Sequence, residues 1–515
     1  MTLRAGNERI NMNSTAATGL AFQREVFGHP RGLATLFFTE MWERLSYYGM
    51  RAILILFMVD QMQSGGLAID DVTATAIYGI YTSAVYLTAL PGGWIADRLI
   101  GAQRAVLLGG IVIMCGHFVL AISGYNAFFL GLLLVILGTG LLKPNVSTLV
   151  GSLYTPADER RDSGFTIFYM GINMGGFLGP LVCGALGQSP HFGWHWGFAA
   201  AGVGMLFGVT QFWMTRRYLG DAGLHPVSTG DVQKDAAFRR KGWIGVAVCM
   251  AALAVFVFGG LSGRIEYDPV QISRTTTWVI VGVVTVYFAG VFTFGRLDAI
   301  ERKRIVVIII LFLGISMFWS GFEQAGSSLN LFADRYTQLE FGWVSIYSSW
   351  LQSLNSLFII IFAPFFAWTW IWLGKRQLNP STPAKFGLGL VLLAVGFAMM
   401  IIASTVVASG ELAMPTWLVL TYLFHTFGEL AISPVGLSAT TKLAPQRYVG
   451  QMMGIWFVGA ALGNLIAGQI AGDFDPNNID AFPGQYWAIV LNTGGVGLIF
   501  LVFTKPVRKL MGGIH

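Results

Sequence analysis

Four charged side chains lie within one otherwise apolar segment near the start of the chain. The stretch "EMWERLSYYGMR", residues 40–51, is preceded by "GLATLFF" and continues into "AILILFMV". A charge at the centre of a bilayer-spanning helix costs about 2.5–3.5 kcal/mol. On a helix the four charged residues share one face with two tyrosines; the six are Glu40, Glu43, Arg44, Tyr47, Tyr48 and Arg51. This polar face predicts contact with a water-filled cavity or with the protein interior.

Three further charged residues each interrupt a different apolar segment. They are Lys143 in "LGTGLLKPN", Glu323 in "MFWSGFEQAGSSLN" and Glu429 in "FHTFGELAISPVG". With the first segment this gives four acids and three bases, so pairing leaves one acid whose simplest neutralisation is a proton. A buried carboxylate that loses its cationic partner to a ligand binds a proton more readily. The set therefore predicts that ligand binding and proton binding are coupled.

Static ion pairs between helices are the alternative interpretation of these residues. Buried ion pairs contribute little to stability, whereas ionisable residues inside a membrane usually mark transport paths or proton relays. We therefore expect a transport function. An intramembrane enzyme would need a nucleophile or a metal-ligand set beside the acids, and the sequence indicates neither, so we expect no enzymatic activity.

The elements that must position these residues are membrane-spanning helices. Of the 515 residues, 55% are hydrophobic and 11% are charged, whereas a soluble domain carries about 25% charged residues. Apolar stretches long enough to cross a bilayer recur from end to end, so we expect an all-α polytopic membrane protein. The fourteen expected spans lie near residues 31–60, 73–98, 104–123, 126–152, 162–187, 194–216, 242–262, 277–296, 305–331, 343–372, 384–408, 415–441, 449–471 and 485–505.

The distribution of Lys and Arg orients these spans, because cytoplasmic loops are rich in both residues. With fourteen spans, the side that holds both termini carries 26 of the 32 basic residues, the opposite side carries 3, and 3 lie within the membrane. We therefore expect both termini to be cytoplasmic. The lack of large soluble loops, together with a two-helix insert, favours a bacterial inner membrane. The same asymmetry accounts for the net charge of +6 without a nucleic-acid partner.

The spans divide into groups of six, two and six. The longest polar stretch between spans, residues 217–241, follows the first six, and the next two spans carry few polar groups, as expected of accessory helices facing lipid. We expect a cytoplasmic N-terminal tail (1–30), an N-terminal six-helix bundle (31–218), a linker with two accessory helices (219–304), a C-terminal six-helix bundle (305–508) and a cytoplasmic C-terminal tail (509–515).

Several separated motifs resemble those of the proton-dependent oligopeptide transporter (POT) family, within the major facilitator superfamily. The family's first-helix motif E-x-x-E-R-F-x-Y-Y appears as "EMWERLSYY", with Leu45 where Phe is usual. The segments "GGWIADRLIGAQRAV", "GLLKPN", "FTIFYMGINMGGF" and "GELAISPVG" also resemble family motifs. The resemblance covers nearly the whole chain. It implies two six-helix bundles of the major facilitator fold with a two-helix insert, and import of di- and tripeptides with protons by alternating access.

The resemblance also implies roles for individual residues. Arg51 and Lys143 would bind the carboxylate of a peptide, and Glu429, Asn173 and Asn355 would bind its amino terminus. The other residues implied in substrate binding would line the cavity or its side-chain pockets; they are Tyr48, Tyr86, Trp319, Ser433 and Trp456.

Proton coupling and gating are implied for the charged residues. The coupling residues would be Glu40, Glu43, Arg44 and Glu323. Two ion pairs would act as gates: Arg51 with Glu323 on the periplasmic side, and Lys143 with Glu429 towards the cytoplasm. Nearby glycines and a proline would let the helices bend; they are Gly321, Gly326, Pro434 and Gly436. In the glycine-rich motif, a cytoplasmic latch between helices would be formed by Asp97, Arg98 and Arg104.

One alternative function stays open, a proton-coupled facilitator for a nitrate-like anion or a drug. The pair Lys143 and Glu429 favours peptides, because a plain anion needs no carboxylate to hold an amine. No cofactor, metal or ATP site is expected from the motifs or the spacing of Cys and His, and His117 and His425 are interpreted as packing residues. The expected partners are a small peptide, protons and the lipid bilayer, with no obligatory protein partner.

Overall fold

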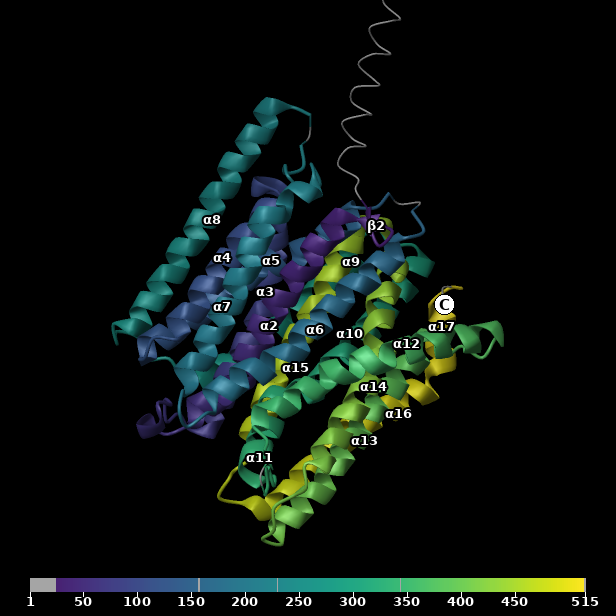
Figure 1. Ribbon diagram of the computed structural model, residues 1–515. Helices are drawn as coiled ribbons and strands as arrows, with labels where there is room; N and C mark the ends of the chain where they lie inside the picture. The colour runs from purple at the N-terminus through teal and green to yellow at the C-terminus, as the bar shows by residue number, and fades with distance from the viewer. Residues whose placement is uncertain (1–24, 156–157, 229, 343, 514–515) are drawn as a thin grey trace, which may run out of the picture.

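The computed structural model describes residues 25–155, 158–228, 230–342 and 344–513, and these are almost entirely helical (Figure 1). Two short antiparallel hairpins are the exceptions: β1 (Glu25–Val26) with β2 (His29–Pro30), and β3 (Glu340–Phe341) with β4 (Val344–Ser345). The prediction of an all-α membrane protein is confirmed. Most of the tail predicted for residues 1–30, and the last two residues of the tail predicted for 509–515, lie outside the described residues.

The first six long helices form an N-terminal bundle. Their bounds are α2 (Arg31–Val59), α3 (Asp71–Ile95), α4 (Ala102–Leu120), α5 (Tyr125–Ser152), α6 (Arg161–Gly187) and α7 (Trp194–Thr215). A short 3-10 turn, η1 (Met62–Ser64), follows α2; a π-helical turn, η2 (Ala96–Ile100), ends α3; and a 3-10 turn, η3 (Arg216–Leu219), ends α7. Helix α2 packs against α6 and α7 inside this bundle, so its charged residues are surrounded by protein rather than lipid.

Close packing of α2 on α6 depends on the glycines of the "GINMGGFLG" segment, residues 171–179. A Cβ on Gly175 would overlap the carbonyl oxygen of Met41, and one on Gly179 would lie 2.5 Å from the carbonyl oxygen of Leu45. Glycine therefore lets the two backbones approach each other, as small residues do in membrane helix pairs.

The second half of the chain forms a C-terminal bundle. Its helices are α10 (Ala299–Phe322), α11 (Ser328–Tyr336), α12 (Ser353–Lys375), α13 (Thr382–Ala408), α14 (Thr416–Leu443), α15 (Val449–Gly472) and α16 (Phe482–Val502), followed by the short α17 (Thr504–Leu510). The 3-10 turns among them are η4 (Glu323–Gly326), η5 (Ser348–Gln352), η6 (Gln446–Tyr448) and η7 (Ile479–Ala481). The turn η4 interrupts one predicted span, residues 305–331. Glu323 is the first residue of this turn.

Two helices lie between the bundles in sequence, α8 (Val232–Leu261) and α9 (Pro269–Phe294). Helix α8 runs along the outer edge of the N-terminal bundle (Figure 1), and none of its most apolar window is buried. Helix α9 packs against both α3 and α15, where Gln469 of α15 donates hydrogen bonds to Ser273 (3.1 Å) and Thr277 (2.8 Å). The insert therefore covers a seam between the two bundles.

Twelve helical segments in the described residues are long and apolar enough to cross a membrane. Helices α2 and α3 are not among the twelve, although they are 29 and 25 residues long. Helix α2 carries the charged stripe, and α3 is rich in Tyr and Thr. Since both pack within the bundles, they complete the fourteen predicted spans.

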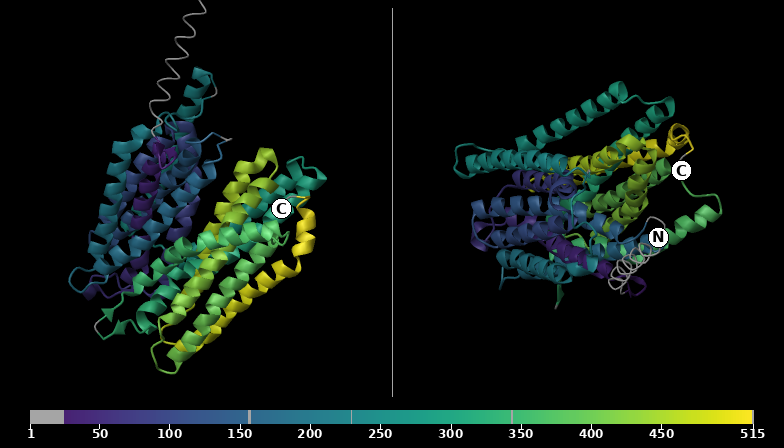
Figure 2. Two further views of the ribbon diagram at one scale, coloured as in Figure 1. Left: turned by 45° about the vertical axis from the view of Figure 1, so that its right-hand side comes forward. Right: turned by 90° about the horizontal axis from the view of Figure 1, so that it is seen from above.

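The bundles have separate hydrophobic cores and lie side by side (Figure 2). They meet where α3 packs on α15 and where α6 packs on α12. The close approach of α3 and α15 again uses glycine, because a Cβ on Gly468 would lie 2.6 Å from the carbonyl oxygen of Thr75. This two-bundle arrangement confirms the predicted major facilitator architecture.

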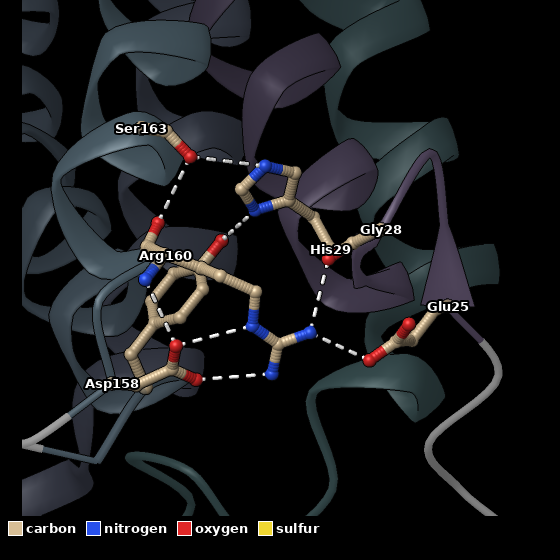
Figure 3. Close-up of polar contacts among 7 residues, drawn as sticks. Glu25, Gly28, His29, Asp158, Arg160 and Ser163 are labelled. Carbon is tan, nitrogen blue, oxygen red and sulfur yellow. Dashed lines mark hydrogen bonds and ion pairs between the residues drawn. The ribbon is translucent and has the colours of Figure 1, made fainter.

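At the end of the molecule that holds the termini, the β1–β2 hairpin is fastened to the connection between α5 and α6 (Figure 3). The ring of His29 forms hydrogen bonds with the hydroxyls of Tyr154 (3.0 Å) and Ser163 (3.1 Å). Arg160 forms ion pairs with Glu25 (2.6 Å) and Asp158 (3.0 Å). These contacts hold the start of α2 against the start of α6.

Candidate functional site

A cavity lies between the two bundles and is lined by residues of both. Seven of the residues implied in function line it, three from the N-terminal bundle and four from the C-terminal bundle. They are Tyr48, Arg51 and Tyr86, and Trp319, Glu323, Asn355 and Glu429. The cavity therefore presents acids, a base, an amide and aromatic rings to a ligand held between the bundles.

Arg51 and Glu323 form an ion pair between the bundles. The Nη2 atom of Arg51 lies 2.7 Å from Oε2 of Glu323, and both side chains are buried. Arg51 also donates a hydrogen bond from Nε to the hydroxyl of Tyr78 on α3, at 2.5 Å. Glu323 is the first residue of η4, the turn at which α10 ends, and this turn places its carboxylate beside Arg51.

Lys143 and Glu429 are not brought together in the described structure. The ammonium of Lys143 lies 3.9 Å from the centre of the Tyr86 ring. Oε2 of Glu429 accepts a hydrogen bond from Asn355 at 3.0 Å, and Asn355 also donates to Thr426. One of the two implied gating pairs is thus formed among the described residues and the other is not.

The polar stripe of α2 divides into two parts. Tyr48 and Arg51 line the cavity, whereas Glu40, Glu43 and Arg44 are between 0% and 4% exposed. Nε of Arg44 lies 2.7 Å from Oε1 of Glu40 and 3.2 Å from Oε2 of Glu43.

Apart from the contact with Arg44, the carboxylate oxygens of Glu43 accept no hydrogen bond from the described residues. Glu43 is therefore the least satisfied acid of the stripe.

Four of the residues implied in substrate binding are not on the cavity wall in this conformation: Lys143, described above, and the three that follow. Asn173 donates to the carbonyl oxygen of Tyr169 in its own helix at 2.9 Å. The buried hydroxyl of Ser433 forms no hydrogen bond with the described residues. Trp456 packs edge-to-face on Phe386, and its ring lies against Gly436. These side chains would have to move to contact a ligand in the cavity.

The sequence interpretation missed several cavity residues. Gln352 and Ser356 line the cavity beside Asn355, and Tyr422 and His425 line it beside Glu429. Each of the four lies three or four residues from another lining residue, which is the spacing of one helix face. This spacing could have predicted them from the sequence. His425, interpreted as a packing residue, does pack against Phe397, with ring centroids 4.7 Å apart, but it also faces the cavity.

Polar contacts between the bundles gather at the end opposite the termini. Arg335 of α11 forms a bidentate ion pair with Asp71 at the start of α3, with distances of 2.5 and 2.9 Å. Gln188, at the end of α6, donates to Ser348 (2.8 Å) and accepts from the hydroxyl of Ser349 (2.6 Å). Asn330 donates to the carbonyl oxygen of Ala52 at 2.8 Å. The cavity is therefore sealed at this end.

Two of the residues implied in the latch, Asp97 and Arg98, contact the segment after α7 from the turn between α3 and α4. The carbonyl oxygen of Asp97 accepts a hydrogen bond from the backbone N–H of Val227 at 2.8 Å, and the guanidinium of Arg98 lies 5.8 Å from the centre of the Phe238 ring on α8. Arg104 is exposed. Gly101 adopts φ +86°, and a Cβ there would lie 2.6 Å from the carbonyl oxygen of Leu224, so this close turn requires glycine.

Two helical bundles around a charged cavity, closed at one end, define a membrane transporter of the major facilitator type. Residues 103–487 match the family model for the POT family. The chain belongs to this family, the proton-dependent oligopeptide transporters.

Named relatives cover almost all of the chain. The chain is 41% identical to the peptide transporter YePEPT of Yersinia enterocolitica over 95% of this chain and 96% of that protein. It is 38% identical to a di-/tripeptide transporter of Lactococcus lactis over 98% of this chain and 100% of that protein. A crystal structure of a peptide transporter POT point mutant in complex with alafosfalin is also similar, with a TM-score of 0.84, 42% identity, and coverage of 95% of this chain and 98% of that chain.

Proposed function

We propose that this protein is a proton-coupled symporter that imports di- and tripeptides by alternating access. The observation that carries the proposal is the cavity between the bundles, with the Arg51 guanidinium on one wall and the Glu429 carboxylate, held by Asn355, on the other. A cation and an anion on facing walls suit the two charged ends of a zwitterionic peptide. Recognition of the backbone ends leaves the peptide side chains free to vary.

Substrate would be bound at its ends by groups from both bundles. Arg51 and Lys143 bind the peptide carboxylate, and Glu429 and Asn355 bind the amino terminus. Asn173 joins them once it leaves the carbonyl oxygen of Tyr169. The remaining contacts to the peptide come from aromatic and hydroxyl side chains: Tyr48, Tyr86, Trp319, Ser433 and Trp456.

Proton coupling would depend on competition for cations. When a peptide carboxylate takes Arg51 or Lys143, an acid paired with that cation loses its partner and gains a proton. Glu323 is paired with Arg51 at 2.7 Å, and Glu43 lies 3.2 Å from Arg44. Glu40, Glu43, Arg44 and Glu323 therefore pass the proton while the ion pairs Arg51–Glu323 and Lys143–Glu429 open and close in turn.

The orientation follows from the basic residues. Most Lys and Arg lie at the end that holds the termini, so this end is cytoplasmic and the sealed end is periplasmic. In a bacterial inner membrane, this arrangement would be an inward-facing state. In the proposed domain division, bundles 31–218 and 305–508 rock about the cavity, with the insert 219–304 at their seam, short cytoplasmic tails, and a latch made by Asp97, Arg98 and Arg104.

The driving force is sufficient for concentrative uptake. One proton crossing a potential of 100 mV releases about 2.3 kcal/mol, which corresponds to a concentration ratio of roughly fifty for a neutral dipeptide. A transmembrane pH difference adds to this ratio.

The proposal is tested by uptake of labelled dialanine into proteoliposomes that hold the purified protein. With an inside-negative potential and an acidic exterior, we expect accumulation well above the equilibrium level, and collapse of accumulation when a protonophore is added. Unlabelled dialanine and trialanine should compete, whereas nitrate should not. Absence of dialanine uptake by correctly inserted protein, together with uptake of labelled nitrate under the same gradients, would instead support the anion transporter.

A further inference from the structure

Arg51 is held by two partners that belong to different bundles. Its Nε atom donates to the hydroxyl of Tyr78 on α3, in the same bundle, at 2.5 Å. Its Nη2 atom pairs with Glu323 of η4, in the opposite bundle, at 2.7 Å. All three residues are at most 7% exposed. The two contacts therefore use different nitrogens of one guanidinium and respond differently when the bundles separate.

The hydroxyl of Tyr78 also lies against the turn that carries Glu323. A Cβ added to Gly326 would overlap this hydroxyl and would lie 3.2 Å from Nε of Arg51. Only glycine lets η4 approach so closely. Closure of the periplasmic end thus places the turn directly over the Tyr78–Arg51 hydrogen bond.

We propose that Tyr78 is a positioning residue that holds the guanidinium of Arg51 in one orientation while its Nη atoms exchange Glu323 for the substrate carboxylate. This inference rests on the proposed function. Helices α2 and α3 belong to one bundle, so rocking of the bundles breaks the contact with Glu323 and leaves the contact with Tyr78 intact. Arginine has five donors in a planar fork, and occupation of Nε by the phenol directs the Nη edge into the cavity.

The arrangement gives affinity by preorganisation. A free arginine side chain must be ordered when it binds a carboxylate, and this ordering weakens binding. Tyr78 orders the side chain before substrate arrives. Its loss should therefore weaken binding of ligands that use Arg51 and should leave other ligands unaffected.

The chain offers a matched control on the same helix. Tyr81 lies three residues after Tyr78, is equally buried at 2% exposure, and its hydroxyl forms no hydrogen bond with the described residues. Tyr78→Phe and Tyr81→Phe each remove one buried hydroxyl from α3 and keep the ring. Only the first removes a partner of Arg51.

The test measures competition with labelled dialanine by two unlabelled ligands, dialanine and its C-terminal amide, for wild type and both variants. For Tyr78→Phe we expect dialanine affinity to fall about tenfold, which equals about 1.4 kcal/mol, and amide affinity to change less than twofold. Tyr81→Phe should match wild type for both ligands. In an Arg51→Lys background, which lacks Nε, Tyr78→Phe should have no further effect.

Three outcomes would overturn the inference. In the first, Tyr78→Phe binds dialanine as wild type does. In the second, its affinities for dialanine and for the amide fall equally, which is the result of a merely structural role. In the third, Tyr78→Phe keeps its full effect in the Arg51→Lys background. Failure of the proposed function has a different signature, because wild-type protein itself would then neither bind nor take up dialanine.

Discussion

Replacing Glu43 by glutamine is expected to abolish concentrative uptake of dialanine while leaving exchange across the membrane intact. Glu43 is fully buried, and among the described residues its one ion pair is with Arg44, at 3.2 Å. Glutamine keeps the size of the side chain but cannot exchange a proton. In proteoliposomes with an inside-negative potential and an acidic exterior, the accumulation ratio should fall from roughly fifty per 100 mV to the equilibrium level. Exchange of labelled for unlabelled dialanine should continue without a gradient.

Glu301→Gln supplies the matched control for this result. Glu301 lies in the first turn of α10 at the end that holds the termini, where it pairs with Arg447 at 2.7 Å. Its replacement removes one paired carboxylate far from the cavity, and accumulation should persist. Full accumulation by the Glu43 variant, or loss of both accumulation and exchange, would contradict the role assigned to Glu43.

The second large effect is expected at Glu429. Its carboxylate lines the cavity and accepts a hydrogen bond from Asn355 at 3.0 Å. Glutamine retains an oxygen for Asn355 but loses the negative charge that pairs with a peptide amino terminus. A buried charge-assisted contact is worth about 3 kcal/mol, so the affinity for dialanine should fall roughly a hundredfold, as measured by competition against a labelled peptide.

N-acetyl dialanine provides the control ligand, because it has no charged amino terminus. Its weak competition should be unchanged by Glu429→Gln. The exposed Glu411, in the turn before α14, provides the control variant, and Glu411→Gln should bind dialanine as wild type does. An equal loss of affinity for both ligands would show that Glu429 supports the cavity rather than recognising the amine.

Local sequence signals were enough to predict the helices and several of the cavity residues. The α2 segment has a stripe of charged residues between apolar flanks. Such a helix fits inside a membrane only when protein surrounds its charged face. Arg51, Glu323 and Glu429 interrupt apolar spans, so each was identifiable without a structure. The contact between Arg51 and Glu323 was available only through the resemblance, since spacing within one helix does not specify a partner 272 residues away.

Residues without an unusual local pattern could not be predicted. Tyr78 lies in a helix rich in Tyr and Thr, where nothing distinguishes it from Tyr81 until α2 is placed beside it. Asp71 and Arg335 lie at the ends of helices, where exposed charges are ordinary, and their pairing depends on how the bundles meet.

Asn173 shows a second limit of sequence analysis. The side-chain amide of an asparagine inside a helix can donate a hydrogen bond either to a distant ligand or to a carbonyl oxygen one turn earlier. In this conformation it donates to Tyr169 in its own helix. The motif predicts the position of Asn173 but does not predict which of the two acceptors it selects.

The central claim is that peptide and proton cross together, and proton movement driven by peptide tests it most directly. Proteoliposomes loaded with a pH-sensitive dye would receive an inward gradient of dialanine, with equal pH on both sides and potassium with valinomycin to hold the potential at zero. We predict acidification of the lumen that requires dialanine, saturates with its concentration and is absent in the Glu43→Gln variant. Dialanine entry at the wild-type rate without acidification would show an uncoupled facilitator and would contradict the account.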